Sequence, residues 1–176
     1  MLPTYGADGS LNVIVESPRG STAKWKWDDG VVRLSRPLPA GLAYPYDWGF
    51  IAGTCASDGD PLDAMIYWEA ASYPGVVIGC RPIGVLRVEQ TSRSSTRRER
   101  NDRVLVVPVN AAAVDVQSAL ELPVRLRTEL EHFFAAAVAF EKKDLMLLGW
   151  GDADESAATI AASIHDRQDA SGRSSI

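Results

Sequence analysis

The stretch Lys24–Leu34, KWKWDDGVVRL, carries the pattern that decides the fold. In Lys24–Asp28, lysine and tryptophan alternate, so one face of an extended segment is aromatic and the other is charged. Asp29-Gly30 is a common hairpin turn, and Val31–Leu34 supplies the returning strand. The stretch therefore predicts a half-buried β-hairpin.

Short apolar segments of the same extended kind lie on both sides of this hairpin. Proline and glycine separate them, and no helical pattern lies in between. The expected strands are Leu11–Glu16, Met65–Trp68, Val76–Cys80, Ile83–Val88 and Val104–Val107. Many short strands at close spacing are typical of a β-barrel or a β-sandwich.

The last third of the chain has a helical pattern instead. Pro123 stands where a helix can begin, and apolar residues then follow three and four apart, on one helix face. These residues are Leu126, Leu130, Phe133 or Phe134, and Ala137. Asp154 and Glu155 open a second amphipathic helix, and a frayed tail is expected over Gln168–Ile176. Strands followed by helices predict an α+β fold, with helices packed on a small barrel.

Length and charge narrow the range of functions. The chain has 176 residues, which suits the single domain 1–176 that we expect. It carries 18 Lys and Arg against 23 Asp and Glu, a net charge of −5. This disfavours nucleic acid as a partner, because such binding depends on neutralising phosphates. No apolar run reaches the ~18 residues of a membrane span, so we expect no membrane partner. With two cysteines and no targeting segment, a cytoplasmic protein is expected.

The segment Ser57–Ala64, SDGDPLDA, carries the strongest chemical signal. In an extended chain Asp58 and Asp60 point to the same side, and the bend at Pro61 brings Asp63 back toward them. Carboxylates held together repel one another unless a cation lies among them. Hard oxygen ligands of this kind select Mg²⁺, Mn²⁺ or Ca²⁺. The competing interpretation is a solvated Asp-Gly turn.

A polar segment, Glu89–Arg103, separates two of the predicted strands. Its sequence, EQTSRSSTRRERNDR, is rich in arginine and serine, so we expect a long exposed loop. The loop is either a solvated hairpin extension or an anion-binding flap. In the second case, arginines would fold over the cavity. They are Arg93, Arg97, Arg98 and Arg100.

Several segments, taken in order, resemble the soluble family I inorganic pyrophosphatases. The resemblance runs from about Leu11 to about Ile164, and Asp58–Asp63, DGDPLD, is a specific motif within it. The other matching segments are Val15–Ser21, Lys24, Arg36, Tyr44-Pro45, Trp48–Phe50, Pro82–Leu86 and His132–Phe134. The resemblance implies a small closed β-barrel of the oligonucleotide-binding (OB) type with two C-terminal helices packed outside. It also implies a homo-oligomer, with the hexamer of bacterial members favoured.

The resemblance implies roles for the acidic residues. Asp58 and Asp63 match ligands of an activating Mg²⁺, for which Mn²⁺ is an expected substitute. Glu16 matches an acid that helps to hold a metal on the substrate side. Asp60 matches the carboxylate that takes a proton from a metal-bridging water, which then attacks the diphosphate. Several Mg²⁺ ions would neutralise the diphosphate and acidify that water.

Three residues match substrate-binding positions of the family. Lys24 and Arg36 match cations that grip the diphosphate, and Tyr44 matches an aromatic residue that lines the cavity. Two departures lie beside them. Lys26 stands where the family has Glu, which reverses the charge. Trp48 stands where the family has Tyr, and an indole N–H donates a hydrogen bond from a different place than a phenol.

The late metal-binding positions are altered. The first family Asp falls at Gln90, and the second falls at Asn101, which can still offer a carbonyl oxygen to a metal. Asp102 is displaced by one residue, and in a strand that shift turns a side chain to the opposite face. Arg103 replaces a Lys and can grip phosphate with two nitrogens. Asn101 and Asp102 are thus candidate metal ligands, and Arg103 is a candidate substrate ligand.

A Tyr-Lys pair of the family falls at Ala137 and Val138, so two phosphate-binding groups are absent. These departures set functional predictions against each other. The favoured one is an inorganic diphosphatase that hydrolyses diphosphate to two orthophosphates with a metal-activated water. The alternative is a degenerate homologue that binds metal or phosphate with little or no turnover, or that acts on another phosphoanhydride. A third is a nucleic-acid binder that uses the barrel and the arginine segment, against the acidic charge.

Overall fold

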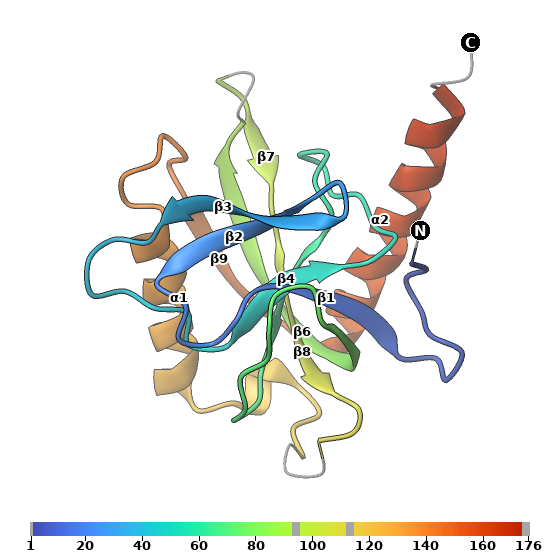
Figure 1. The fold of residues 1–176 in the computed structure, drawn as a ribbon, viewed down its shortest axis with the longest axis horizontal. Coiled ribbons are helices and arrows are strands. Elements are labelled where there is room, and N and C mark those ends of the chain that lie inside the picture. The colour runs from blue at the N-terminus through green and yellow to red at the C-terminus, as the bar shows by residue number, and fades with distance from the viewer. Residues whose placement is uncertain (1, 93–95, 112–114, 174–176) are drawn as a thin grey trace.

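A closed ring of hydrogen-bonded strands forms the centre of the fold (Figure 1). The computed structural model describes residues 2–92, 96–111 and 115–173. The ring runs in the order β1 (Leu11–Ser17), β4 (Asp47–Ile51), β5 (Asp63–Ile66), β8 (Arg103–Pro108) and β6 (Val77–Thr91), and β6 pairs again with β1. β5 and β8 pair in parallel, and the other neighbours are antiparallel. This closed barrel confirms the predicted α+β, OB-like fold.

Strand β6 is longer than the ring requires. It has 15 residues and also pairs with β7 (Arg98–Arg100) and β9 (Met146–Gly151). The separate strands predicted over Val76–Cys80 and Ile83–Val88 are therefore one strand. Its pairing with β8 shifts register beside Pro82, so a proline is accommodated at an irregularity within the strand.

The two long helices lie on opposite sides of the barrel (Figure 1). α1 spans Val124–Ala137 and follows Pro123, as predicted, and α2 spans Ala153–Arg173. A short 3-10 helix, Ala119–Glu121, precedes α1. Residues 168–173, part of the predicted tail, belong to α2. The last three residues of the tail lie outside the described residues, so its fraying stays a prediction. None of the described helices is long and apolar enough to cross a membrane.

The core consists of two apolar clusters on the two faces of the barrel wall. Strand β8 contributes to both. Val104 and Val106 belong to one cluster and Leu105 and Val107 to the other, because successive side chains of a strand point to opposite faces. The apolar face of α1 packs in the cluster that contains Leu105, and Ile160 of α2 packs in the cluster that contains Val104. Burial on both faces explains why β8 is a continuous hydrophobic run.

Strand β4, which the sequence pattern does not predict, comes unusually close to β1 at Gly49. A Cβ atom on Gly49 would lie 1.8 Å from the carbonyl oxygen of Ile14. No side chain fits in that space, so glycine is required by the approach of the two backbones. The approach fixes the end of β1, which carries Glu16, against β4, and β4 in turn pairs with β5.

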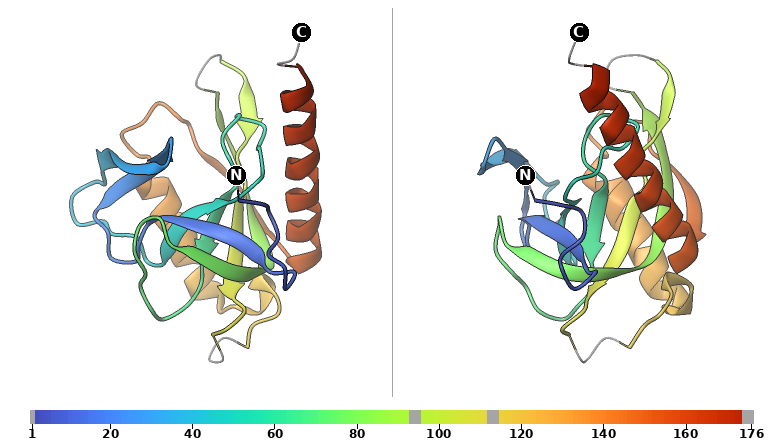
Figure 2. Two further views of the ribbon diagram at one scale, coloured as in Figure 1. Left: turned by 45° about the vertical axis from the view of Figure 1, so that its right-hand side comes forward. Right: turned by 90° about the vertical axis from the view of Figure 1, so that its right-hand side faces the viewer.

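The predicted hairpin forms from β2 (Ala23–Asp28) and β3 (Val31–Pro37), a two-stranded sheet separate from the ring. It projects from the barrel on the side of α1, away from α2 (Figure 2). The backbone N–H of Trp27 donates a 2.6 Å hydrogen bond to Oε1 of Glu16. This bond ties the hairpin to the barrel through a side chain of the candidate site.

Candidate active site

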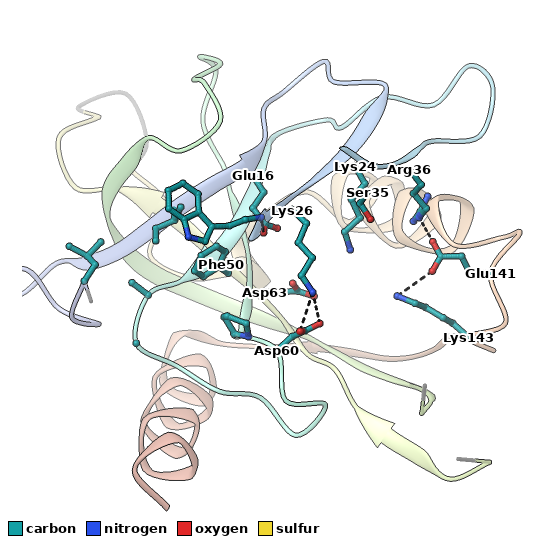
Figure 3. A pocket seen from close by; sticks show the side chains of 16 residues that line it. Glu16, Lys24, Lys26, Ser35, Arg36, Phe50, Asp60, Asp63, Glu141 and Lys143 are labelled. Atoms are coloured by element: carbon teal, nitrogen blue, oxygen red, sulfur yellow. Dashed lines mark hydrogen bonds and ion pairs between the residues drawn. The ribbon is translucent and has the colours of Figure 1, made fainter. Parts of the chain in front are cut away.

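A pocket of about 610 Å³ lies between the β2–β3 hairpin, the mouth of the barrel and the turn that follows α1 (Figure 3). Its ionisable lining residues are Glu16, Lys24, Lys26, Arg36, Asp60, Asp63, Glu141 and Lys143. All except Lys26, Glu141 and Lys143 were predicted as site residues. The pocket therefore gathers acids and bases that are far apart in the sequence.

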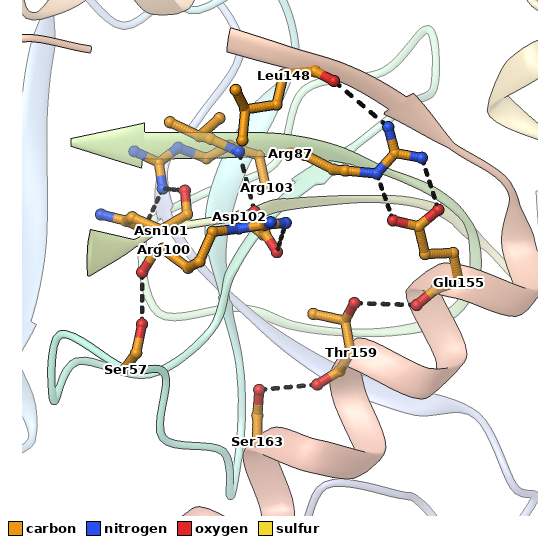
Figure 4. Close-up of polar contacts among 11 residues, drawn as sticks. Ser57, Arg87, Arg100, Asn101, Asp102, Arg103, Leu148, Glu155, Thr159 and Ser163 are labelled. Atoms are coloured by element: carbon orange, nitrogen blue, oxygen red, sulfur yellow. Dashed lines mark hydrogen bonds and ion pairs between the residues drawn. The ribbon is translucent and has the colours of Figure 1, made fainter. Parts of the chain in front are cut away.

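Asp60 is paired with the residue that reverses the family's charge. Nζ of Lys26 lies 3.2 Å and 3.4 Å from the two carboxylate oxygens of Asp60 (Figure 3). Asp60 sits in a turn, since its backbone N–H donates to Oδ1 of Asp58 at 3.2 Å and Gly59 has a φ of 83°. The extended conformation expected for Asp58 and Asp60 is wrong, and Asp58 does not line the pocket. Ser57 ties this turn to the carbonyl of Arg100 with a 2.6 Å hydrogen bond (Figure 4).

Asp63 is paired with a buried arginine from β8. Nη1 of Arg103 lies 2.6 Å from Oδ2 of Asp63. The same nitrogen donates to the carbonyl oxygen of Asn101 at 2.7 Å and to Oδ1 of that residue. The guanidinium also stacks over the rings of Trp48 and Phe134, at 5.5 Å and 6.0 Å. Neither Arg103 nor Asn101 lines the pocket. Arg103 holds Asp63, and Asn101 holds Arg103.

Glu16 is the most buried carboxylate of the pocket, with 7% of the residue exposed. Burial raises its pKa from the ordinary value of 4.5 to about 7. The hydrogen bond from Trp27 opposes this rise, nearby Asp63 adds to it, and Lys24 and Lys26 oppose it. Glu16 therefore changes charge near neutral pH.

The opposite wall of the pocket is cationic. Burial lowers the pKa of Lys24, and the charges of Asp63 and Lys143 act on it in opposite directions. Arg36 of β3 forms an ion pair with Glu141, and Nζ of Lys143 lies 3.4 Å from the other oxygen of that carboxylate (Figure 3). Charged groups thus line this wall from two strands and from the turn after α1.

Two further predicted site residues lie outside the pocket lining. Tyr44 is buried in the core, with its ring centroid 5.2 Å from that of Phe133. Asp102 accepts a 2.9 Å hydrogen bond from the backbone N–H of Val88 and pairs with Arg100 at 2.8 Å (Figure 4). Neither lines the pocket.

The arginine-rich segment forms a hairpin extension in its described part. Arg98 pairs with Asp144 at 2.8 Å and with Glu89 at 3.4 Å. Arg100 pairs with Asp102, and the described arginines of the segment do not line the pocket. Arg93 lies outside the described residues. The structure therefore favours the hairpin extension over the flap for this part of the segment.

The family positions that this chain has lost are filled by core packing. Gln90 is fully buried, and neither of its amide atoms has a hydrogen-bond partner in the described part of the chain. Ala137 packs in the core at the end of α1, and Val138 follows as the C-cap residue. Sequence reasoning missed Glu141 and Lys143. The two residues belong to the charged run 141–143, which follows an apolar stretch. The spacing of charges in this run does not indicate that it lines a pocket.

The carboxylates of the pocket are of the type that binds a divalent cation, but they are not clustered at a single point. Asp60, Asp63 and Glu16 line one pocket and offer the oxygen ligands that hard cations take. Within the residues that the structure describes, no three His, Cys, Asp or Glu side chains form a group that could hold a metal ion. The donor chemistry fits a divalent cation, which would compete with Lys26 for Asp60 and with Arg103 for Asp63.

Comparisons with known proteins agree over nearly the whole chain. A model of the inorganic pyrophosphatase family matches residues 13–168. An inorganic pyrophosphatase of Synechocystis is 36% identical over 156 residues, covering 87% of this chain and 89% of its own, and one of Sulfolobus acidocaldarius is 33% identical, covering 92% and 94%. The crystal structure of an inorganic pyrophosphatase from Thermus thermophilus superposes with a TM-score of 0.86 at 31% identity, covering 95% of this chain and 97% of that one. The extent of these matches places the chain in the inorganic pyrophosphatase family.

Proposed function

We propose that the protein hydrolyses inorganic diphosphate to two orthophosphates with the help of a divalent metal ion, Mg²⁺ in the first place and Mn²⁺ as a substitute. The observation that carries the proposal is the pocket itself. It sets the carboxylates of Asp60, Asp63 and Glu16 opposite the cations Lys24 and Arg36, in a chain of the pyrophosphatase family. A highly anionic substrate that is attacked by water needs both kinds of group.

The cationic wall binds the substrate in this proposal. The Lys24 ammonium and the Arg36 guanidinium contact phosphate oxygens, and the planar guanidinium does so with two nitrogens. Asp60 accepts the proton of the attacking water, since it lines the pocket across from these cations. Arg103 acts through Asp63, which it holds at 2.6 Å. Tyr44 supports the wall from the core and does not contact the substrate.

The metal would be held by carboxylates of the same pocket. Asp63 and Glu16 line it, and Asp58 lies next to it in the turn of Asp60. When bound, a divalent cation neutralises phosphate charge and lowers the pKa of water. Asn101 and Asp102 can join the ligand set only by leaving the arginines with which they pair, so we assign them a secondary part. Metal binding by these two residues would break the contact of Arg103 with Asn101 and that of Arg100 with Asp102.

The experiment measures phosphate release by the purified protein from diphosphate with Mg²⁺ and with Mn²⁺. Asp60→Asn is expected to lower kcat by about 10²–10⁴-fold, because it removes the proton acceptor. Asp115→Asn, an exposed change outside the pocket lining, is the matched control and should leave kcat unchanged. Undiminished turnover in Asp60→Asn would exclude the assigned mechanism. Binding of diphosphate without any phosphate release would exclude the proposed activity and favour a degenerate homologue.

We also propose a cytoplasmic homo-oligomer, with a hexamer preferred. Bulky apolar side chains stand exposed on and beside α1, among them Val124 at 70% and Phe140 at 88%. Such groups are common where subunits meet. Cys55 and Cys80 are both free thiols, which suits a reducing compartment. Light scattering on the purified protein tests the oligomer, and a monomer at micromolar concentration would contradict it.

A further inference from the structure

The turn after α1 places a carboxylate between two cations inside the pocket. Glu141 pairs with Arg36 through one oxygen and with Lys143 through the other, the latter at 3.4 Å. Only 14% of the Lys143 side chain is exposed, although it follows Lys142, which is exposed. Figure 3 shows Arg36 and Lys143 both directed at the Glu141 carboxylate, beside Lys24. A lysine with this burial is directed into the pocket and away from bulk water.

The backbone of Lys143 is fixed by strands of the barrel. Its carbonyl oxygen accepts a 2.6 Å hydrogen bond from the N–H of Thr91, at the end of β6. The next residue, Asp144, is held by Arg98 of β7 through its carboxylate at 2.8 Å and its carbonyl at 3.1 Å. The turn is therefore anchored to the barrel strands at Lys143 and at Asp144. The Lys143 ammonium approaches the pocket from a rigid base.

A phosphate group presents the same chemistry as the carboxylate that these cations now hold. A carboxylate is planar and a phosphate is tetrahedral, but the anionic oxygens of both accept charge-assisted hydrogen bonds from guanidinium and ammonium groups. Glu141 is half-buried, and rotation about its side-chain bonds is enough to take its carboxylate away from Arg36 and Lys143. Lys24, Arg36 and Lys143 all line one pocket, and the charge of Lys143 helps to lower the pKa of Lys24.

We propose that Lys143 is a further substrate-binding residue, and that Arg36 and Lys143 exchange the Glu141 carboxylate for a phosphate group of the substrate. The identity of that substrate as diphosphate rests on the proposed function. The exchange itself requires only a phosphate-bearing anion. In this arrangement Glu141 is an internal competitor that keeps the two cations in position until the substrate displaces it. No assigned metal ligand takes part in it.

The test is calorimetric binding of inorganic diphosphate and of inorganic phosphate to the full chain in EDTA, so that no metal contributes. Lys143→Gln is expected to weaken diphosphate binding about tenfold, the size of one charge-assisted contact. Lys142→Gln, the exposed neighbour, should bind within about twofold of the unaltered protein, by the same scale. Glu141→Gln should bind several-fold more tightly, because the competitor has lost its charge. Lys143→Arg, which keeps the charge, should restore binding.

The outcomes separate this inference from the proposed function. Equal binding by Lys143→Gln and Lys142→Gln overturns the inference, whether or not the protein hydrolyses diphosphate. Weaker binding by Lys143→Gln supports it even in a protein that shows no turnover. If Glu141 serves only to hold the turn, Glu141→Gln lowers the melting temperature without tightening binding, and the exchange is refuted. Should Lys143→Gln fail to fold, the comparison of Lys143→Arg with Glu141→Gln decides, since the proposal requires the second to bind more tightly than the first.

Discussion

Asp47 and Asp60 are both satisfied carboxylates, but different kinds of partner hold them. Asp47 is fully buried and accepts hydrogen bonds from the backbone N–H groups of Arg19 and Ser72, at 2.7 Å and 3.3 Å, and from the indole of Trp68 at 3.1 Å. Asp60 is partly exposed and faces the ammonium of Lys26, on a long and flexible side chain. Fixed donors make a carboxylate part of the framework, whereas a flexible cation can give way to a ligand.

The same distinction runs through the rest of the pocket. Two of its ion pairs join side chains from different elements, Asp63 with Arg103 and Arg36 with Glu141. Each such pair can be opened by a rotation about single bonds. Two of the three donors to Asp47 are backbone N–H groups, which side-chain rotation cannot move away. We therefore expect substitutions at Asp47 to affect stability, and substitutions at the pocket pairs to affect binding.

Asp47→Ala should give the largest effect on stability. It leaves three donors without an acceptor in a fully buried position, and we expect the free energy of unfolding to fall by about 3–5 kcal/mol. In a chain of this length the melting temperature should drop by about 10 °C. Asp60→Ala is the matched change and should cost less than about 1 kcal/mol. Equal losses in thermal unfolding of the two variants would remove the distinction between framework and pocket carboxylates.

Glu16 combines features of both carboxylates, because it is buried like Asp47 and lines the pocket like Asp60. Its ionisation should make the stability of the protein depend on pH. Its pKa is about 7 in the folded protein against an ordinary 4.5, so between these pH values the folded state holds a proton that the unfolded chain has released. Stability from this group is complete below about pH 4.5 and is lost as pH rises through 7, by roughly 3 kcal/mol.

The measurement is urea unfolding in EDTA between pH 5 and 8, compared with Glu16→Gln. The amide cannot ionise, so this variant should lose less stability than the unaltered protein over that range. The difference between the two should grow as pH rises. Parallel curves for the two proteins would show that Glu16 does not titrate in this window.

Lys26→Gln should have the smallest effect on stability and a clear effect on metal binding. The ion pair with Asp60 is partly exposed, so its loss should change the free energy of unfolding by less than about 1 kcal/mol. Removal of the ammonium frees the carboxylate of a competing cation, and we expect Mg²⁺ to bind several-fold more tightly in titration calorimetry. Lys142→Gln serves as the control. An unchanged Mg²⁺ affinity would show that Lys26 does not compete with the metal.

Much of the fold follows from local pattern. The hairpin of Lys24–Leu34 and the start of α1 at Pro123 were predicted because alternation, turn residues and helical spacing are properties of neighbouring residues. Strand β4 was missed because its sequence, DWGFI, shows no alternation of buried and exposed side chains; four of its five residues are buried. Its central Gly49 makes sense only once β1 lies across it.

The candidate site divides in the same way. Asp60 and Asp63 stand in one short motif, and the resemblance adds Glu16, Lys24 and Arg36; the structure places all of them around one pocket. The partners of the acids come from distant segments, so no spacing in the sequence indicates them. The displacement of Asp102 could be noticed from the sequence. That Asp102 turns toward Arg100, and that Asn101 holds Arg103, required the folded chain.

The length of β6 has a consequence for how the protein is made. This strand pairs with β1 near one end and hydrogen-bonds to Lys143 at the other. It therefore connects an early strand of the chain to the turn after α1, which forms part of the pocket wall. A nascent polypeptide that has not yet emerged from the ribosome as far as β9 has neither that wall nor the strand that covers β6. The pocket is therefore complete only once the chain as far as β9 has left the exit tunnel.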